Sequence, residues 1–123
     1  MGMDVYGNEP KNEKGEYFRA NVWSWRPIVC IMDLAGGEEL FNEKSWYSMN
    51  FNDGAGLDTA ELAEELGDRI SEWITEKDLT EGHWYEWHPW DDGDDFDRTY
   101  GISRDHLKEF VTFLRNCGGF RVW

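Results

Sequence analysis

The sequence predicts an α+β fold with about three helices and a small sheet formed by the two terminal segments and the segment around Trp46. Two stretches carry apolar residues at helical spacing, and both ends of the chain alternate apolar and polar residues as short strands do. Glycine pairs and an Asn-Asp-Gly turn separate these stretches. The length of 123 residues fits one acidic domain over 1–123.

The first quarter of the chain predicts a strand, a loop and a second short extended segment. Met1–Tyr6 alternates apolar and polar residues, and Gly7–Gly15 is polar throughout. Glu16–Trp25 is aromatic-rich, so we expect a short strand or a turn there.

A helix and then a strand are expected next. Pro27 suits the first turn of a helix, and Gly36-Gly37 ends it. Ser45–Phe51 has the composition of a strand, which the Asn52-Asp53-Gly54 turn would end. The apolar residues that would continue the first helix are Ile28, Ile31, Met32 and Ala35.

The clearest prediction is a helix from Thr59 to Lys77. Asp58, with Glu61 three residues later, resembles a capping box at its start. One face of this helix would be apolar and the opposite face acidic. The apolar face consists of Leu62, Leu66, Ile70, Trp73 and Ile74, and the acidic face of Glu61, Glu65, Asp68, Glu72 and Glu76.

The last third predicts a loop region, a helix and a closing strand. Thr80–Tyr100 contains Pro89 and Gly93, so it is expected to be mostly loop, with a strand at His83–Trp87. A final helix would start near Ser103 as N-cap and end at Gly118-Gly119. Phe120–Trp123 then alternates and would pair with the N-terminal strand. The apolar stripe of that helix is Leu107, Phe110, Val111, Leu114 and Cys117.

The charge of the chain is concentrated in one stretch. Between Asp58 and Asp97 there are fifteen acidic residues and only two basic ones, Arg69 and Lys77, which gives −13 of the total −14. The electric field of so concentrated a negative charge repels nucleic acid and anionic membrane surfaces and attracts basic proteins. We therefore expect no direct nucleic-acid partner and no membrane partner.

Motifs of catalysis, cofactor binding and membrane insertion are missing from the sequence. It contains no GxSxG, no P-loop and no dinucleotide fingerprint, so we predict no enzyme, no catalytic residues and no cofactor. No apolar run reaches about 18 residues, and the N-terminus lacks the apolar region of a signal peptide. Cys30 and Cys117 lie in apolar contexts, which favours buried, reduced thiols over a disulfide or a redox pair.

The acidic helix face is the leading candidate for a binding site. Its five carboxylates span 15 residues, or about 22 Å, which is one charge per 5–6 Å against about 3.4 Å per phosphate of a DNA strand. The hypothesis is a nucleic-acid mimic that binds a basic, nucleic-acid-binding protein and inhibits it; a plain solvated face is the alternative. The aspartates Asp91, Asp92, Asp94, Asp95 and Asp97 would add charge, with Trp87 and Trp90 as aromatic anchors.

The same segment offers a metal-binding alternative. His83 and His88, with Asp91 nearby, combine imidazole and carboxylate ligands that suit transition metals. The histidines are five residues apart, which fits neither HExxH nor a helical H-x₃-H spacing, and the aspartates miss the EF-hand pattern. A small metal-dependent enzyme or a metal-stabilised module using these residues is the second hypothesis.

Basic residues also gather on one side of the last helix. Arg104, Lys108 and Arg115 would either pair with the acidic helix or form a small basic patch; we expect the pairing.

Five segments of the sequence are distinctive when taken together: MGMDVYG, KGEYFR, NVWSWRP, NDGAGLD and FLRNCGGF. Together they resemble an uncharacterised family of small proteins from bacteriophage and bacterial genomes. The resemblance implies an accessory protein that acts on a host protein in the bacterial cytoplasm, and a minor phage structural protein is a further alternative. Many members carry a Cys-rich, zinc-site-like insertion before the last helix, whereas this chain has His83, His88 and aspartates there, so no zinc ligand is carried over.

Overall fold

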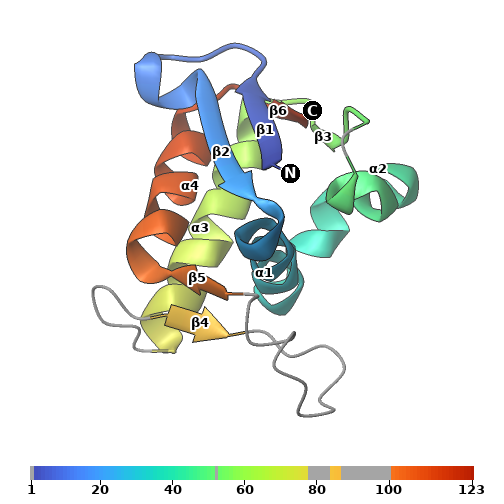
Figure 1. The fold of residues 1–123 in the computed structure, drawn as a ribbon. Coiled ribbons are helices and arrows are strands. Elements are labelled where there is room, and N and C mark those ends of the chain that lie inside the picture. The colour runs from blue at the N-terminus through green and yellow to red at the C-terminus, as the bar shows by residue number, and fades with distance from the viewer. Residues whose placement is uncertain (1, 52, 78–83, 87–100) are drawn as a thin grey trace.

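The computed structural model describes residues 2–51, 53–77, 84–86 and 101–123. They form an α+β fold with a four-stranded antiparallel sheet, a two-stranded sheet and four α-helices (Figure 1). The strands are β1 (Gly2–Gly7), β2 (Tyr17–Asn21), β3 (Gly56–Leu57), β4 (Trp84–Glu86), β5 (Gly101–Ser103) and β6 (Phe120–Val122), and the helices are α1 (Val22–Leu34), α2 (Glu43–Tyr47), α3 (Ala60–Glu76) and α4 (Arg104–Asn116).

The larger sheet has the strand order β2-β1-β6-β3. The predicted pairing of the terminal strands is confirmed, because β1 and β6 are antiparallel neighbours with Val5 opposite Val122. Both ends of the chain therefore lie side by side (Figure 1). On β1 and β2, Val5 and Phe18 face each other on the buried side, whereas Asp4 and Arg19 face each other on the solvated side. One solvated face is typical of antiparallel sheets.

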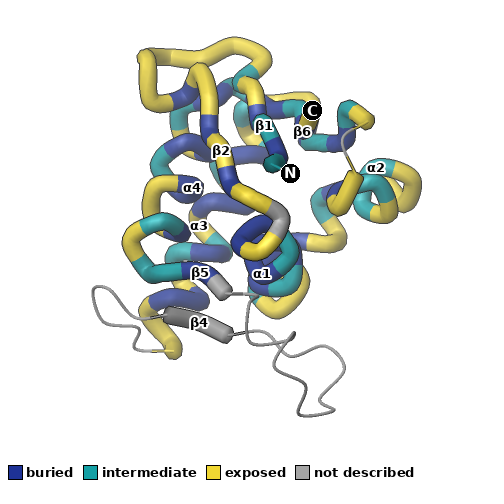
Figure 2. Tube along the Cα trace, in the orientation of Figure 1, coloured by how far each residue is buried: buried dark blue, intermediate teal, exposed yellow. Residues whose placement is uncertain are grey.

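The core lies between the buried side of this sheet and the helices α1, α3 and α4 (Figures 1 and 2). Trp25 is fully buried at its centre, and its indole N–H donates to the backbone oxygen of Met49 at 2.6 Å. Its ring meets Phe110 edge-on at 5.7 Å. The apolar stripes predicted for the two long helices are confirmed, since Leu66 and Ile70 of α3 and Leu114 of α4 are fully buried.

The prediction of a strand at Ser45–Phe51 is wrong. The segment 45–51 is not a strand of the sheet: α2 and a 3₁₀ helix at Ser48–Asn50 occupy it. The Asn42 side chain caps α2 by accepting from the Ser45 N–H at 2.7 Å, and the Trp46 ring packs on Phe41 at 5.3 Å. A local cap and an aromatic contact therefore outweigh the strand-like composition of this segment.

The first helix starts five residues earlier than Pro27. The Asn21 side chain accepts from the Ser24 N–H at 3.0 Å, so Asn21 is the N-cap and α1 begins at Val22. Pro27 consequently lies inside the helix, where it has no N–H to donate to the preceding turn.

Both cysteines are free, but the predicted burial is confirmed only for Cys117, because Cys30 is half-buried. Cys117 is fully buried beside β6, and burial raises the pKa of its thiol to about 11. The Cys117 thiol donates to the Leu114 backbone oxygen at 3.4 Å. A thiol with so high a pKa stays protonated at neutral pH, which makes it a packing residue and not a nucleophile.

Candidate functional site

The exposed side of α3 brings the predicted acidic residues into one row. Thr59, and not Asp58, is the N-cap of this helix, because its hydroxyl accepts from the Leu62 N–H at 3.2 Å. Seventeen residues follow in one helix, so carboxylates three and four residues apart lie on the same side. The five members are all exposed, as predicted: Glu61, Glu65, Asp68, Glu72 and Glu76.

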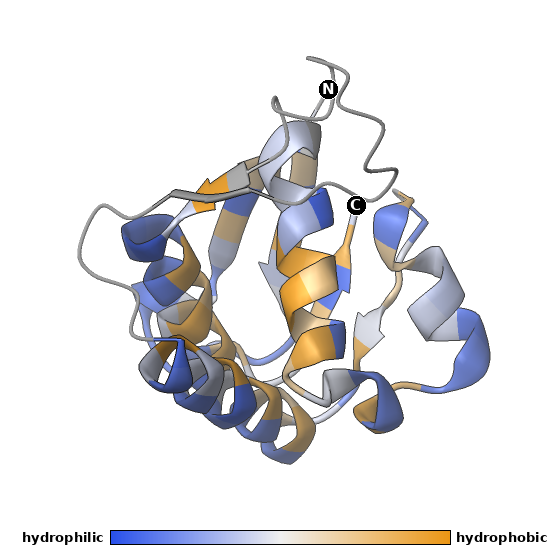
Figure 3. Ribbon diagram, turned by 90° about the horizontal axis from the view of Figure 1, so that it is seen from below, coloured by the Kyte–Doolittle hydropathy of each residue, from blue (hydrophilic) through white to orange (hydrophobic). Residues whose placement is uncertain are grey.

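The opposite side of α3 fixes this row against the core. Ala63, Gly67 and Ile70 are buried, and α3 packs along α4. A Cβ atom at Gly67 would lie 3.4 Å from the Cβ of Leu114, so glycine allows the two helices to approach closely. Hydrophilic residues cover the outer sides of these helices and hydrophobic residues face inward (Figure 3). The carboxylate row therefore stands on a rigid element.

Arginine side chains bind two of the five carboxylates. Arg69 Nε donates to Glu65 at 3.0 Å, and its Nη1 donates to Glu39 and to the Gly36 backbone oxygen, each at 2.5 Å. The hydrogen bonds to Glu39 and then to Glu65 raise the pKa of the Arg69 guanidinium above its ordinary value. Arg69 thus ties α3 to the turn after α1.

Arg115 of α4 binds the second carboxylate, Asp68, at 3.2 Å. The predicted pairing between the last helix and the acidic helix is therefore confirmed for Arg115. No ion pair joins Arg104 or Lys108 to α3 within the described ranges.

The remaining three members of the row, Glu61, Glu72 and Glu76, have no ion pair with any residue that the structure describes. Neighbouring acids are partly neutralised: Lys11 binds Glu64 at 2.6 Å, and Arg121 binds Asp58. Within the described part of the chain, no basic side chain neutralises the carboxylates at the two ends of α3.

The other predicted site residues lie outside the described residues: His83, His88, Trp87, Trp90, Asp91, Asp92, Asp94, Asp95 and Asp97. The strand predicted at His83–Trp87 is confirmed for its central part, β4.

Among the described residues, no group of three or more His, Cys, Asp or Glu side chains is placed to hold a metal ion. None of the helices in the described ranges has both the length and the apolar character needed to cross a membrane.

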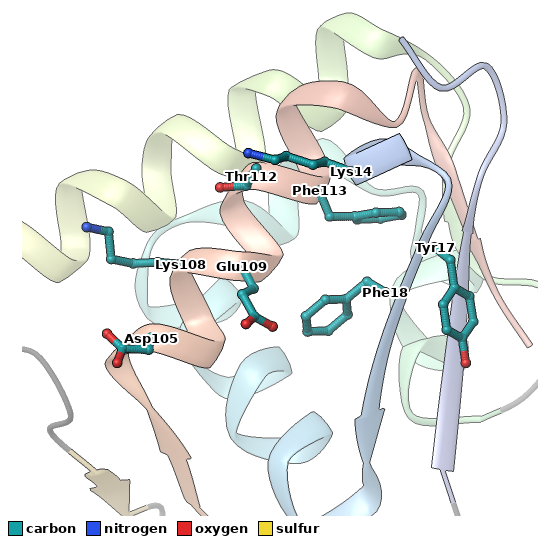
Figure 4. Close-up of a pocket in the computed structure, with 8 residues that line it drawn as sticks. All are labelled: Lys14, Tyr17, Phe18, Asp105, Lys108, Glu109, Thr112 and Phe113. Carbon is teal, nitrogen blue, oxygen red and sulfur yellow. The ribbon is translucent and has the colours of Figure 1, made fainter. Parts of the chain in front are cut away.

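Surface hollows lined by described residues lie away from the acidic row, and three of them are large enough to hold a side chain or a small molecule. A groove of about 540 Å³ separates β2 from α4, with Phe18 and Phe113 pointing into it and Tyr17 pointing away (Figure 4). Its edge carries two lysines, Lys14 and Lys108, and two carboxylates, Asp105 and Glu109, so its charges balance. A polar hollow of about 270 Å³ lies beside the ion pair of Asp58 and Arg121.

The third hollow, about 680 Å³, is aromatic and was missed by sequence reasoning. Tyr47 and Phe51 line it and are 75% and 52% exposed. They are four residues apart, a spacing that places two side chains on the same side of a helix and also of a strand. This spacing was the signal in the sequence that could have indicated the hollow.

Glycines of four of the five segments that carry the resemblance to phage proteins lie close to neighbouring backbone. A Cβ atom at Gly7 would lie 1.9 Å from the Gly15 backbone oxygen, and one at Gly118 would lie 2.2 Å from the Glu9 backbone oxygen. A Cβ atom at Gly56 would lie 1.9 Å from the Phe120 backbone oxygen. These glycines are thus explained by close backbone packing.

Comparison with known proteins finds no matching family model, no matching curated protein and no matching solved structure. The resemblance to phage proteins therefore stays a prediction.

Proposed function

We propose that this chain is a non-enzymatic acidic protein that binds a basic surface of a nucleic-acid-binding protein and thereby competes with nucleic acid. The observation that supports it is the exposed carboxylate row of α3, in which Glu61, Glu72 and Glu76 have no ion pair among the described residues. The helix already fixes the backbone that carries these charges, so little backbone entropy is lost when a partner with arginines or lysines binds them.

The length of the row suits a groove that holds a nucleic-acid backbone. Glu61 and Glu76 are 15 residues apart, or about 22 Å along the helix axis. The row is less dense than the phosphates of one DNA strand, at about 3.4 Å each. Further acids would therefore have to contribute, and Glu64 and the aspartates Asp91–Asp97 are the candidates. A bacterial host protein is the expected target, following the sequence resemblance.

Affinity capture at two salt concentrations tests this proposal. Tagged chain is incubated with bacterial lysate at about 0.1 M and about 0.5 M salt, where the Debye length falls from about 10 Å to under 5 Å. We expect a nucleic-acid-binding protein to be retained at the lower salt and lost at the higher one. Retention of no specific protein at either salt would overturn the proposal.

A further inference from the structure

The outer strand of the larger sheet, β2, has one side of its backbone open. It ends the strand order β2-β1-β6-β3, and no strand in the described part of the chain pairs with its second side. The Gly7 N–H donates to the Glu16 oxygen at 3.1 Å, which fixes the direction of the hydrogen bonds between β1 and β2. Because this direction alternates along an antiparallel strand, the backbone groups of Tyr17 and Arg19 point to the open side.

Helix α4 borders this open side and occupies one end of it. The Nε2 atom of His106 lies 3.1 Å from the Arg19 backbone oxygen, so the imidazole ring covers the edge there. The Arg19 N–H and both backbone groups of Tyr17 form no hydrogen bond to another described residue. Two N–H donors and one carbonyl acceptor therefore remain on the edge. Such an edge is a template for a further strand.

The groove beside this edge has room for one peptide strand with a side chain directed inward. It measures about 540 Å³, and Phe18 of β2 and Phe113 of α4 point into it (Figure 4). A strand added to β2 turns every second side chain to the same face as Phe18. The residue opposite Phe18 would bury an apolar side chain against the two rings. Because α4 stands beside the edge, a single peptide fits there better than the whole sheet of a second copy.

The charges around this groove balance in number but lie at different ends. Lys14 lies where β2 begins, whereas Asp105 lies at the other end, in the first turn of α4 (Figure 4). Glu109 is one turn further along α4, and the Lys108 side chain extends away from the two rings (Figure 4). Neither Lys14 nor Asp105 forms an ion pair with another described residue. The arrangement is complementary to a ligand with an anionic end near Lys14 and a cationic group near Asp105.

We propose that this groove binds the C-terminal segment of a protein partner as an added strand, antiparallel to β2. The N–H of the last residue donates to the Tyr17 oxygen, and the terminal carboxylate accepts from the Tyr17 N–H beside Lys14. The penultimate residue is apolar and packs against Phe18 and Phe113. A basic side chain two residues before it lies near Asp105. In this mode of recognition, main-chain hydrogen bonds give affinity and pockets for alternate side chains give specificity.

This inference goes beyond the proposed function and does not depend on it. The groove belongs to β2 and α4, whereas the carboxylate row belongs to α3, so the two surfaces can bind different proteins. The Arg19 N–H donates to the carbonyl of the third residue from the end of the peptide. Antiparallel pairing is the only direction that brings the terminal carboxylate to Lys14, because β2 begins at that end.

The test is a nuclear magnetic resonance titration of ¹⁵N-labelled chain with the peptide acetyl-Gly-Lys-Ser-Leu-Ser, which has a free C-terminal carboxylate. We expect saturable downfield shifts of the Tyr17 and Arg19 amide protons, because both form new hydrogen bonds. Methylation of the backbone nitrogen of the last residue removes its N–H and should weaken binding about 5-fold. A C-terminal amide in place of the carboxylate should weaken binding about 3-fold.

Variants of the chain test the same contacts from the other side. Proline at position 19 lacks the N–H, and that N–H points away from β1, so no hydrogen bond of the sheet is lost. Arg19→Pro should bind the peptide about 5-fold more weakly than Arg19→Ala, which keeps the N–H. Lys14→Gln should weaken binding about 3-fold, whereas Lys44→Gln, at an exposed lysine outside the groove, should leave it unchanged. Circular dichroism checks the folding of each variant.

Equal affinity of the N-methylated and unmethylated peptides would overturn the inference, and this comparison needs no variant of the chain. Equal affinity of the amide and the carboxylate peptides would also overturn it. Shifts of the Tyr17 and Arg19 amide protons on concentrating the chain alone would show that a second copy occupies the edge, and would contradict the assignment to a partner's C-terminal segment.

Discussion

Reversing the charges of Glu61, Glu72 and Glu76 to lysine is expected to weaken binding to the basic partner about 100-fold. Each reversal removes an attraction and adds a repulsion, together about 1 kcal/mol at an exposed site, and 1.4 kcal/mol corresponds to a factor of ten. These three carboxylates are the right choice because Glu65 and Asp68 bind Arg69 and Arg115. A lysine at those two positions would repel an arginine and disturb the packing of α3.

A charge-matched control separates a local site from a general effect of net charge. Glu13, Glu16 and Glu109 are exposed, lie outside α3 and have no ion pair with any residue in the described part of the chain. Three Glu→Lys changes add six units in either set, so both variants change the net charge from −14 to −8. Affinity is measured by calorimetry and folding by circular dichroism. Equal weakening by the two sets would show that net charge, and not the α3 row, drives binding.

Replacing Gly15 with alanine is expected to destabilise the fold by about 3 kcal/mol. The added Cβ atom would lie 1.9 Å from the Asn116 backbone oxygen and 2.8 Å from the Cys117 backbone nitrogen, so backbone must move. That movement would also strain the hydrogen bond from the Lys11 N–H to the Asn116 oxygen, which is 2.8 Å long. Urea unfolding measures the loss.

Gly2→Ala is the matched control for this prediction. Its added Cβ atom would approach only the end of the flexible Arg19 side chain, at 2.8 Å, and that side chain can move aside. We expect its unfolding free energy to stay within about 0.5 kcal/mol of the wild-type value, as for most surface changes. A Gly15→Ala chain as stable as Gly2→Ala would contradict the close packing around Gly15.

Periodic segments were predicted well because their signal is local. The apolar stripe and the charged face of α3 follow from one 3.6-residue period, and Ser103 was identified as the cap of α4 from its position before an apolar run. The glycine stop after α4 is confirmed by the positive φ angles of Gly118 and Gly119, which are 67° and 95°. Each of these features depends only on neighbours within about one or two helical turns.

The errors occurred where an asparagine cap was not recognised in the sequence. Asn42 caps α2, which includes Trp46, and Asn21 caps α1 and so places its start before Pro27. A short aromatic segment has no period long enough to distinguish helix from strand.

The candidate site combines features that depend on local contacts with features that depend on distant ones. The exposure of the carboxylate row was predictable from the helix period. That Arg69 would bind Glu39 and the Gly36 backbone oxygen was not, because these partners are 30 and 33 residues away.

Competition with DNA tests the central claim most directly. The captured partner is bound to a fluorescent DNA duplex, and the chain is added while fluorescence anisotropy is recorded at about 0.1 M salt. If the carboxylate row occupies the nucleic-acid groove, the chain displaces the DNA, and the chain carrying Glu61→Lys, Glu72→Lys and Glu76→Lys does not. A stable complex of partner, DNA and chain together would contradict the account, because it would place the acidic row outside that groove.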